Sequence, residues 1–289
     1  MNQRQPAATS PQNAEGALTP VALRARIRTG RRAGHTSGAS LGYVQANLVI
    51  VPATLAGSFR DFCLANPQPL PLLEVTEPGV PDALRIAPGA DLRTDVPRYC
   101  VYRQGRLTEQ PADITALWQD DFVAFLLGCS FTAEDHLLAA GVQLSHLAAG
   151  RNVAMWATNR ACIPVGPWHG PMVVSMRPIA TDQLDITLKV TGRLPLAHGA
   201  PVHVGDPASI GVTDLAAPDW GDAMIVSAHE TPVFWACGVT PQAVIAASAP
   251  ELAITHAPGR MFVTDVASND VIDRHPVLAD QLSELATRS

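Results

Sequence analysis

The high frequency of proline and glycine restricts the fold of this chain more than any other sequence feature. The 289 residues include 25 prolines and 21 glycines. They divide the apolar sequence into short segments, because proline interrupts helices and central strands and glycine favours turns. Segments with strand-like and helix-like patterns alternate without an internal repeat. This pattern predicts an α/β fold.

Local signals place the individual elements. Thr19 and Pro20 form a typical helix start, and Gly30 ends the same segment. Pro52 separates an apolar strand from the helix that follows it. The sequence predicts helices at 21–29, 53–65, 114–127, 133–149 and 242–248, and strands at 43–51, 70–75, 98–102, 153–158, 172–179, 184–191, 202–204, 224–227, 233–236, 252–255 and 261–263.

The order of these elements suggests a domain organisation. Two predicted helices followed by a small antiparallel hairpin, turning at 181–183, are typical of a compact α+β unit. We therefore predict a mixed-sheet α/β core formed by 19–108 and 201–289, with a smaller α+β unit inserted at 109–200. Residues 1–18 are predicted to be a disordered tail. A cleft between the two units is the expected binding site.

Composition excludes several classes of function. The formal net charge is −6, which disfavours nucleic acid as a partner, and the low charged fraction of 16% leaves room for a homo-oligomer interface. No segment approaches the roughly 18 apolar residues of a membrane span, and no signal core is visible, so a cytoplasmic protein is expected. Five scattered cysteines fit neither a disulfide framework nor a zinc site.

Cofactor chemistry is also restricted. Lys189 is the only lysine and lies in a predicted strand, which argues against pyridoxal phosphate. The chain lacks a Walker loop and the glycine-rich dinucleotide fingerprint. We therefore predict neither a cofactor nor a bound metal.

Two strand-end loops are the first candidates for chemistry. In the loop at 203–207, Asp206 could act as a general base and His203 as a proton donor. A turn stabilised by Asp206, with His203 in a structural hydrogen bond, is the alternative. In the loop at 255–260, His256 could transfer protons and Arg260 could bind a carboxylate, while a type II turn is the structural alternative.

Other polar residues interrupt apolar segments. Gln45 and Asn47 lie inside a predicted buried strand, so each needs either a structural partner or a ligand. Ser130 and Thr240 stand near predicted helix starts, where they would cap the helix or bind an anion. The remaining candidates are Arg93, which belongs to a charged cluster suited to surface ion pairs or an anion site, and Glu230, an acid or base beside an apolar strand.

Several of these residues belong to longer motifs. The chain contains GYVQANL at 42–48, RTD at 93–95, GCSF at 128–131, GPMVVSMRP at 170–178, HVGDP at 203–207, FWACGVTPQ at 234–242 and THAPG at 255–259. In this ordered set, from about residue 19 to residue 269, the chain resembles the D-glutamate cyclase family, whose bacterial members are commonly labelled hydro-lyases. The resemblance implies a two-part α/β fold and the conversion of D-glutamate to 5-oxo-D-proline with loss of water.

That reaction suggests roles for the candidate residues. The substrate amine must lose a proton, the γ-carbonyl oxyanion needs donors, and hydroxide must leave as water. Asp206 or Glu230 would be the base, and His203 or His256 the acid. Arg177 or Arg260 would hold the α-carboxylate. Gln45, Asn47, Arg93, Ser130 and Thr240 complete the set of predicted substrate-binding residues.

Three alternatives remain open at the level of sequence. A hydratase or dehydratase of another small carboxylic acid would use the same groups. A non-catalytic protein that binds a small amino acid or carboxylate would use the arginines and amides equally well. A metal site built by His203, Asp206 and His256 is the third alternative, although the sequence holds no compact ligand motif.

Overall fold

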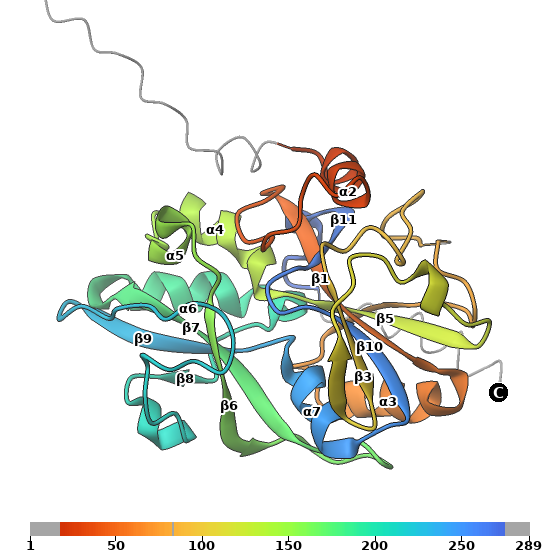
Figure 1. Cartoon of the computed structure of the whole chain (residues 1–289). Coiled ribbons are helices and arrows are strands. Elements are labelled where there is room, and N and C mark those ends of the chain that lie inside the picture. Colours follow the sequence, from red (N-terminus) through yellow and green to blue (C-terminus); the bar gives the residue numbers. More distant parts are fainter. Residues whose placement is uncertain (1–17, 83, 275–289) are drawn as a thin grey trace, which may run out of the picture.

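The computed structural model describes residues 18–82 and 84–274, and its strands form two antiparallel sheets (Figure 1). The predicted tail, except Leu18, lies outside the described residues. The larger sheet consists of seven strands: β1 (Tyr43–Pro52), β2 (Leu72–Val75), β3 (Tyr99–Arg103), β4 (Arg106–Glu109), β5 (Phe122–Gly128), β10 (Leu252–His256) and β11 (Phe262–Ala267). Their order is β2-β5-β1-β10-β3-β4, and β11 pairs with β1.

The smaller sheet consists of β6 (Ala154–Ala161), β7 (Pro171–Ala180), β8 (His203–Val204) and β9 (Glu230–Ala236), in the order β6-β7-β9-β8. Every strand pair in both sheets is antiparallel, whereas the sequence analysis predicted a mixed sheet. Strand direction depends on which distant segments pair. For example, β1 pairs with β5, β10 and β11, and no local pattern encodes these partners.

The α-helices in the described part of the chain are α2 (Pro20–Arg28), α3 (Ala53–Ala65), α4 (Glu134–Ala139), α5 (Ser145–Ala149), α6 (Leu184–Gly192) and α7 (Thr240–Ser248). Single 3₁₀ turns occur at Thr115–Leu117, Ser130–Ala133, Thr181–Gln183, Pro195–Ala197, Pro207–Ile210 and Ser268–Val271. The predicted cap of α2 is confirmed, because the Thr19 hydroxyl accepts a hydrogen bond from the Ala22 amide at 3.3 Å. None of these helices has the length and apolar character of a membrane span.

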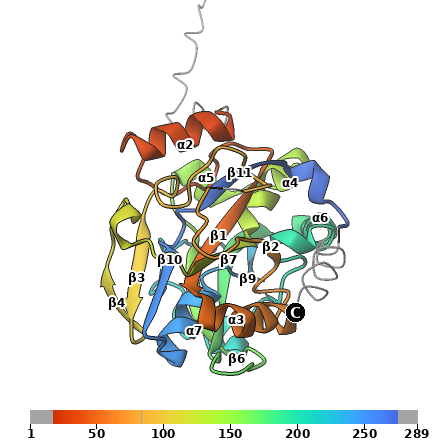
Figure 2. The same ribbon diagram turned by 90° about the vertical axis from the view of Figure 1, so that its right-hand side faces the viewer.

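Both faces of the larger sheet are covered. On one face, Phe59 of α3 packs against Phe125 and Trp168 in edge-to-face contacts, and Val244 of α7 joins the same core. On the other face, the connection from β2 to β3 contributes Leu92 and other apolar side chains to a second core. Figure 2 shows α3 and α7 together at the end of the molecule opposite α2.

The smaller sheet also has two distinct faces. Alternation along β7 directs Met176 into a core that contains Trp156 and Phe234, while Ile179 and Trp235 face the opposite way. That second face contacts the region of α4, α5 and α6, which lie beside this sheet in Figure 1. The layer between the smaller sheet and these helices therefore has its own core.

Two predicted elements are wrong in type. The predicted helix at 114–127 is a 3₁₀ turn followed by strand β5, whose residues are all buried. A short, continuous apolar run cannot be assigned to helix or strand from periodicity alone. The predicted strand at 184–191 is helix α6, which buries Thr187 and Thr191 and leaves Ile186 and Leu188 exposed. The predicted hairpin at 181–183 is therefore absent from the described structure.

Two further predictions need correction. The predicted helix at 133–149 is interrupted at Gly141, which has a φ of +83°, and becomes the separate helices α4 and α5. The predicted strand at 224–227 is irregular, since no neighbouring strand pairs with it there. Strand β5 belongs to the larger sheet, and β8 and β9 belong to the smaller one.

Candidate active site

Five polar side chains meet in the layer between the smaller sheet and helices α4 and α5. We refer to Ser37, Ser130, Glu134, His146 and Arg177 as the Glu134 cluster. The side chains of Glu134, His146 and Arg177 belong to residues that are 0%, 1% and 2% exposed. Burying an ion pair and an imidazole together is costly unless each group finds partners, so such clusters are frequently functional.

Glu134 accepts hydrogen bonds from four directions. His146 Nε2 lies 2.9 Å from its Oε1, and Arg177 Nη2 lies 3.4 Å from the same oxygen. The Ser37 hydroxyl donates to Oε1 at 2.9 Å, and the Gly38 amide donates to Oε2 at 3.0 Å. The carboxylate is therefore held rigidly by groups from three separate segments of the chain.

Arg177 links Glu134 to the smaller sheet. Its Nη2 also donates to the Ser130 hydroxyl at 3.2 Å, and Nη1 lies 3.5 Å from the Ser175 hydroxyl. The guanidinium carbon lies 5.5 Å from the centre of the Trp235 ring. Its buried Nε makes no hydrogen bond with any described residue. The guanidinium therefore retains a donor that could bind a planar anion.

The surroundings fix the protonation states. Burial opposes ionisation of Glu134, but the His146 hydrogen bond and the positive charge of Arg177 outweigh it, so the pKa of Glu134 lies below its ordinary value of 4.5. Burial lowers the pKa of His146 below 6.5, and Glu134 offsets this only in part. At neutral pH, Glu134 is anionic and His146 is neutral.

The fold brings these groups together from distant segments. Strand β5 ends at Gly128, and the chain turns through Ser130 to start α4 at Glu134. The cluster is covered by the connection between α2 and β1, residues 29–42, which we call the covering segment. Gln45 Nε2 holds this segment by donating to the Thr36 and Ala39 carbonyl oxygens at 3.0 and 3.1 Å.

Among the sequence-predicted residues, the structure brings Ser130 and Arg177 together in the Glu134 cluster. Gln45 positions the covering segment next to them. Asn47 Nδ2 donates to the Gly128 carbonyl oxygen at 2.6 Å, and Thr240 Oγ1 donates to that of Cys237 at 2.6 Å. Asn47 and Thr240 therefore have structural partners.

His203, Asp206 and Glu230 make contacts within turns. His203 Nε2 lies 2.6 Å from the Asp206 carbonyl oxygen, and the Asp206 carboxylate accepts from the Ala208 amide at 3.1 Å. The Glu230 carboxylate accepts from the Ser227 amide at 2.9 Å. These are local turn contacts, and none of them reaches the Glu134 cluster.

The other two predicted arginines are also engaged elsewhere. Arg93 forms an ion pair with Asp91 at 2.7 Å, and Arg260 Nε donates to the Ala33 carbonyl oxygen at 3.0 Å. Among the residues that the structure describes, no group of three histidine, cysteine or acidic side chains is arranged to hold a metal ion.

His256 lies inside the larger sheet and is fully buried. Its Nδ1 accepts a hydrogen bond from the Leu48 amide at 3.1 Å. Burial lowers the pKa of His256 to about 4, and burial has the same effect on His198, which is 1% exposed. Both imidazoles are therefore neutral at physiological pH and serve as parts of the core.

These two histidines predict a loss of stability in mild acid. In the unfolded chain each takes up a proton below about pH 6.5, whereas the folded protein does so only near pH 4. The contribution of each neutral histidine to the free energy of unfolding is complete above pH 6.5 and declines as the pH falls toward 4. At pH 5 the free energy of unfolding is lower by roughly 2 kcal/mol per histidine. Urea unfolding at pH 7.5 and 5.0 measures this difference, and equal free energies of unfolding would contradict it.

Sequence reasoning missed Glu134 and His146. Both fell within one predicted helix, where an acid in the first turn is an ordinary stabilising residue. The available signal was the position of Glu134 four residues after Ser130, directly behind a buried apolar segment. Ser37 gave no signal, because serine is common in a loop rich in glycine.

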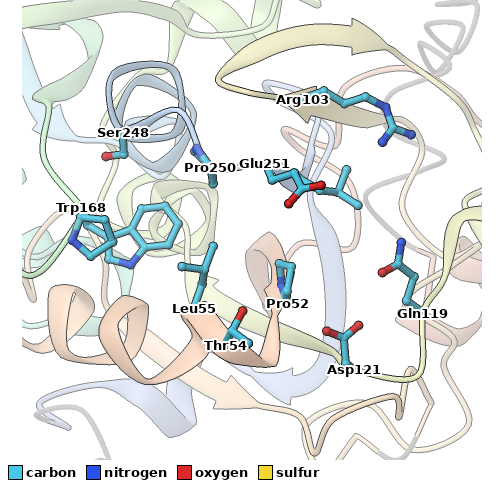
Figure 3. Close-up of a pocket in the computed structure, with 12 residues that line it drawn as sticks. Pro52, Thr54, Leu55, Arg103, Gln119, Asp121, Trp168, Ser248, Pro250 and Glu251 are labelled. Carbon is cyan, nitrogen blue, oxygen red and sulfur yellow. The ribbon is translucent and has the colours of Figure 1, made fainter.

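A cavity of about 560 Å³ lies elsewhere, at the end of the larger sheet between α3 and α7 (Figure 3). Trp168 and Leu55 form one side of it, and Asp121 and Glu251 reach toward it from the other side. No sequence-predicted site residue and no member of the Glu134 cluster lines this cavity. Its charged side chains are exposed, so it lacks the buried, charge-coupled groups that distinguish the cluster.

Comparison with known proteins identifies the family. The D-glutamate cyclase family model matches residues 123–265, a range that contains Ser130, Glu134, His146 and Arg177. A protein of Rubrobacter xylanophilus named "Putative hydro-lyase" is 57% identical over 250 residues, which cover 86% of this chain and 96% of that protein. Proteins with the same designation from Stutzerimonas stutzeri and Bacillus licheniformis are 55% and 52% identical, covering 86% of this chain and 94% and 95% of their own lengths. The chain therefore belongs to the D-glutamate cyclase family.

Proposed function

We propose that this protein is a hydro-lyase that converts D-glutamate to 5-oxo-D-proline with loss of water, and that the reaction takes place at the Glu134 cluster. The observation that carries this proposal is the buried pair of Arg177 and Glu134, in which Arg177 keeps an unused Nε donor. Arg177 can bind a carboxylate and Glu134 attracts an ammonium group, and D-glutamate carries both of these groups. Membership of the D-glutamate cyclase family supports the same substrate.

The cluster offers separate contacts for each part of the substrate. Arg177 would hold the α-carboxylate through its planar guanidinium, and the negative charge of Glu134 would attract the ammonium group without binding it directly. The Ser130 hydroxyl would donate to the γ-carboxylate oxygen that becomes negative during attack. Holding the flexible substrate folded is itself a large part of catalysis, because the reaction is intramolecular.

Substrate must pass the covering segment. Every member of the Glu134 cluster is less than a tenth exposed, and Ser37 and Gly38 close over Glu134 with direct hydrogen bonds. We propose that this segment opens to admit substrate and closes again to exclude water. Gly38, at a φ of +72°, provides the backbone conformation that brings its amide to the carboxylate.

The test is direct. Purified full-length protein is incubated with D-glutamate, and 5-oxoproline is measured by mass spectrometry, with L-glutamate and other small amino acids in parallel. We expect product from D-glutamate. Absence of product across pH and added divalent metals would overturn the proposal, and product from a different substrate alone would overturn the choice of D-glutamate.

Two arginine variants test the location of the site. Arg177→Lys keeps the charge but loses the planar fork, so kcat/KM for D-glutamate should fall by about 10²-fold or more. Arg60→Lys is the matched control, because Arg60 forms only a partly exposed ion pair with Asp61 on α3, and its kcat/KM should not change. An Arg177→Lys protein with full activity would show that the reaction occurs elsewhere.

A further inference from the structure

The two ring nitrogens of His146 have different surroundings. Nε2 lies 2.9 Å from Glu134 Oε1, whereas Nδ1 is buried and makes no hydrogen bond with any described residue. Glu134 is ionised and can only accept, so Nε2 of the neutral ring must carry the proton. Nδ1 therefore holds an unshared electron pair inside a site whose other polar atoms are largely paired.

The ionisable groups that face His146 shift its pKa in opposite directions. Glu134 approaches from α4, Arg177 from β7 and His35 from the covering segment. Burial lowers the pKa of His146 most, and the positive charge of Arg177 lowers it further, while Glu134 raises it. His35 Nε2 lies 3.3 Å from the Gly150 carbonyl oxygen, which anchors that second ring at the end of α5.

Glu134 is poorly suited to accept a proton itself. Its two oxygens already accept from Ser37, Gly38, His146 and Arg177, and its pKa lies below the ordinary value. A carboxylate with occupied lone pairs and a low pKa is a weak base. The imidazole behind it has a buried nitrogen with a free lone pair, which is better suited to proton transfer.

We propose that His146 Nδ1 is the catalytic base and acid of the reaction, and that Glu134 is a positioning residue that fixes the tautomer of the ring. This inference rests on the proposed function. Nδ1 takes a proton from the substrate ammonium group, the amine nitrogen bonds to the γ-carbon, and the imidazolium returns that proton to a γ-oxygen. A second proton then moves from the amine nitrogen through Nδ1 to the same γ-oxygen, while the bond between that oxygen and the γ-carbon breaks. The oxygen leaves as water, and the ring ends neutral.

His146→Gln is the most informative variant, because its amide can still donate to Glu134 from the Nε2 position but offers no basic nitrogen. We expect kcat for D-glutamate to fall by about 10²- to 10⁴-fold, while D-glutamate still raises the melting temperature through Arg177. Ser145→Ala is the control within the same helix, since the buried Ser145 hydroxyl makes no hydrogen bond with described residues. Its kcat should match that of the wild type.

The pH profile separates catalysis from structural support. In the wild type, kcat/KM should rise with pH through the deprotonation of His146, below pH 6.5. His146→Gln should lack this rise, and Glu134→Gln should shift it to lower pH, because the carboxylate raises the pKa of the ring. This measurement needs only the wild type if the variants fail to fold.

The possible outcomes are distinct. A wild-type protein that forms no 5-oxoproline overturns the proposed function. An active wild type whose kcat/KM does not rise with pH below 6.5, or a His146→Gln variant with wild-type kcat, overturns only the role of His146. The role of His146 is supported if His146→Gln loses kcat and its kcat/KM no longer rises with pH.

Discussion

Replacing Arg177 with methionine is expected to lower the free energy of unfolding by about 3–5 kcal/mol, because the change leaves Glu134 buried without its cationic partner. Methionine fills much of the volume of the arginine stem, so lost packing contributes little. The lost guanidinium also contacts Ser130 and the face of Trp235. Urea denaturation at pH 7.5, followed by circular dichroism, measures the change.

The control is the double variant Arg177→Met with Glu134→Gln. Removing the carboxylate charge eliminates the uncompensated ion, so the double variant should be more stable than Arg177→Met alone. Lowering the pH should likewise remove the charge of Glu134 in the Arg177→Met variant, because Glu134 there becomes protonated at a higher pH than in the wild type. A double variant no more stable than the single one would show that Arg177 stabilises the protein through packing instead.

Gly128→Ala is expected to destabilise the protein by more than about 3 kcal/mol, or to prevent folding. A Cβ atom at this position would lie 1.6 Å from the Leu196 carbonyl oxygen and 2.8 Å from its carbon, and both are backbone atoms that cannot rotate away. Gly128 also donates to the Pro71 carbonyl oxygen at 2.7 Å, so β5 cannot easily shift. Because Ser130 lies only two residues later, any displacement here also moves the Glu134 cluster.

Gly57→Ala is the matched control for this substitution. Gly57 lies inside α3, and a Cβ there would meet no atom within 4 Å. Alanine should therefore stabilise the helix by roughly 0.5–1 kcal/mol. Thermal unfolding of both variants makes the comparison. A Gly128→Ala protein that melts with the wild type would contradict the close approach of β5 to the turn at Leu196.

Elements bounded by strong local signals could be predicted from the sequence. Helix α3 has the predicted bounds, because Pro52 and Pro67 flank it, and α2 starts at the predicted Thr19 cap. Strands β5 and β6 show the contrast. The sequence predicted a strand at 153–158, which is β6, but the continuous apolar run of β5 was assigned to a helix. Pairing with β1 and β2 decides that β5 is a strand.

The residues of the candidate site were also only partly predictable from the sequence. Residue type and family motifs pointed to Ser130 and Arg177, which lie in contact. His256 looked equally suitable in the sequence, yet it lies inside the larger sheet, because a histidine at a strand end carries no signal of its burial. Glu134 and His146 looked ordinary because their chemistry depends on neighbours that are distant in the chain.

The sequence by itself determined the family, the caps and breaks that bound α2, α3 and β1, and two of the polar residues that meet in the cluster. Only the tertiary structure decided which side chains meet. The carboxylate of Glu134 is held by Ser37, His146 and Arg177, which come from a loop, a helix and a strand. Caps and turns depend on hydrogen bonds between residues that are close in the sequence. A buried charge instead depends on partners that only folding brings together and separates from water.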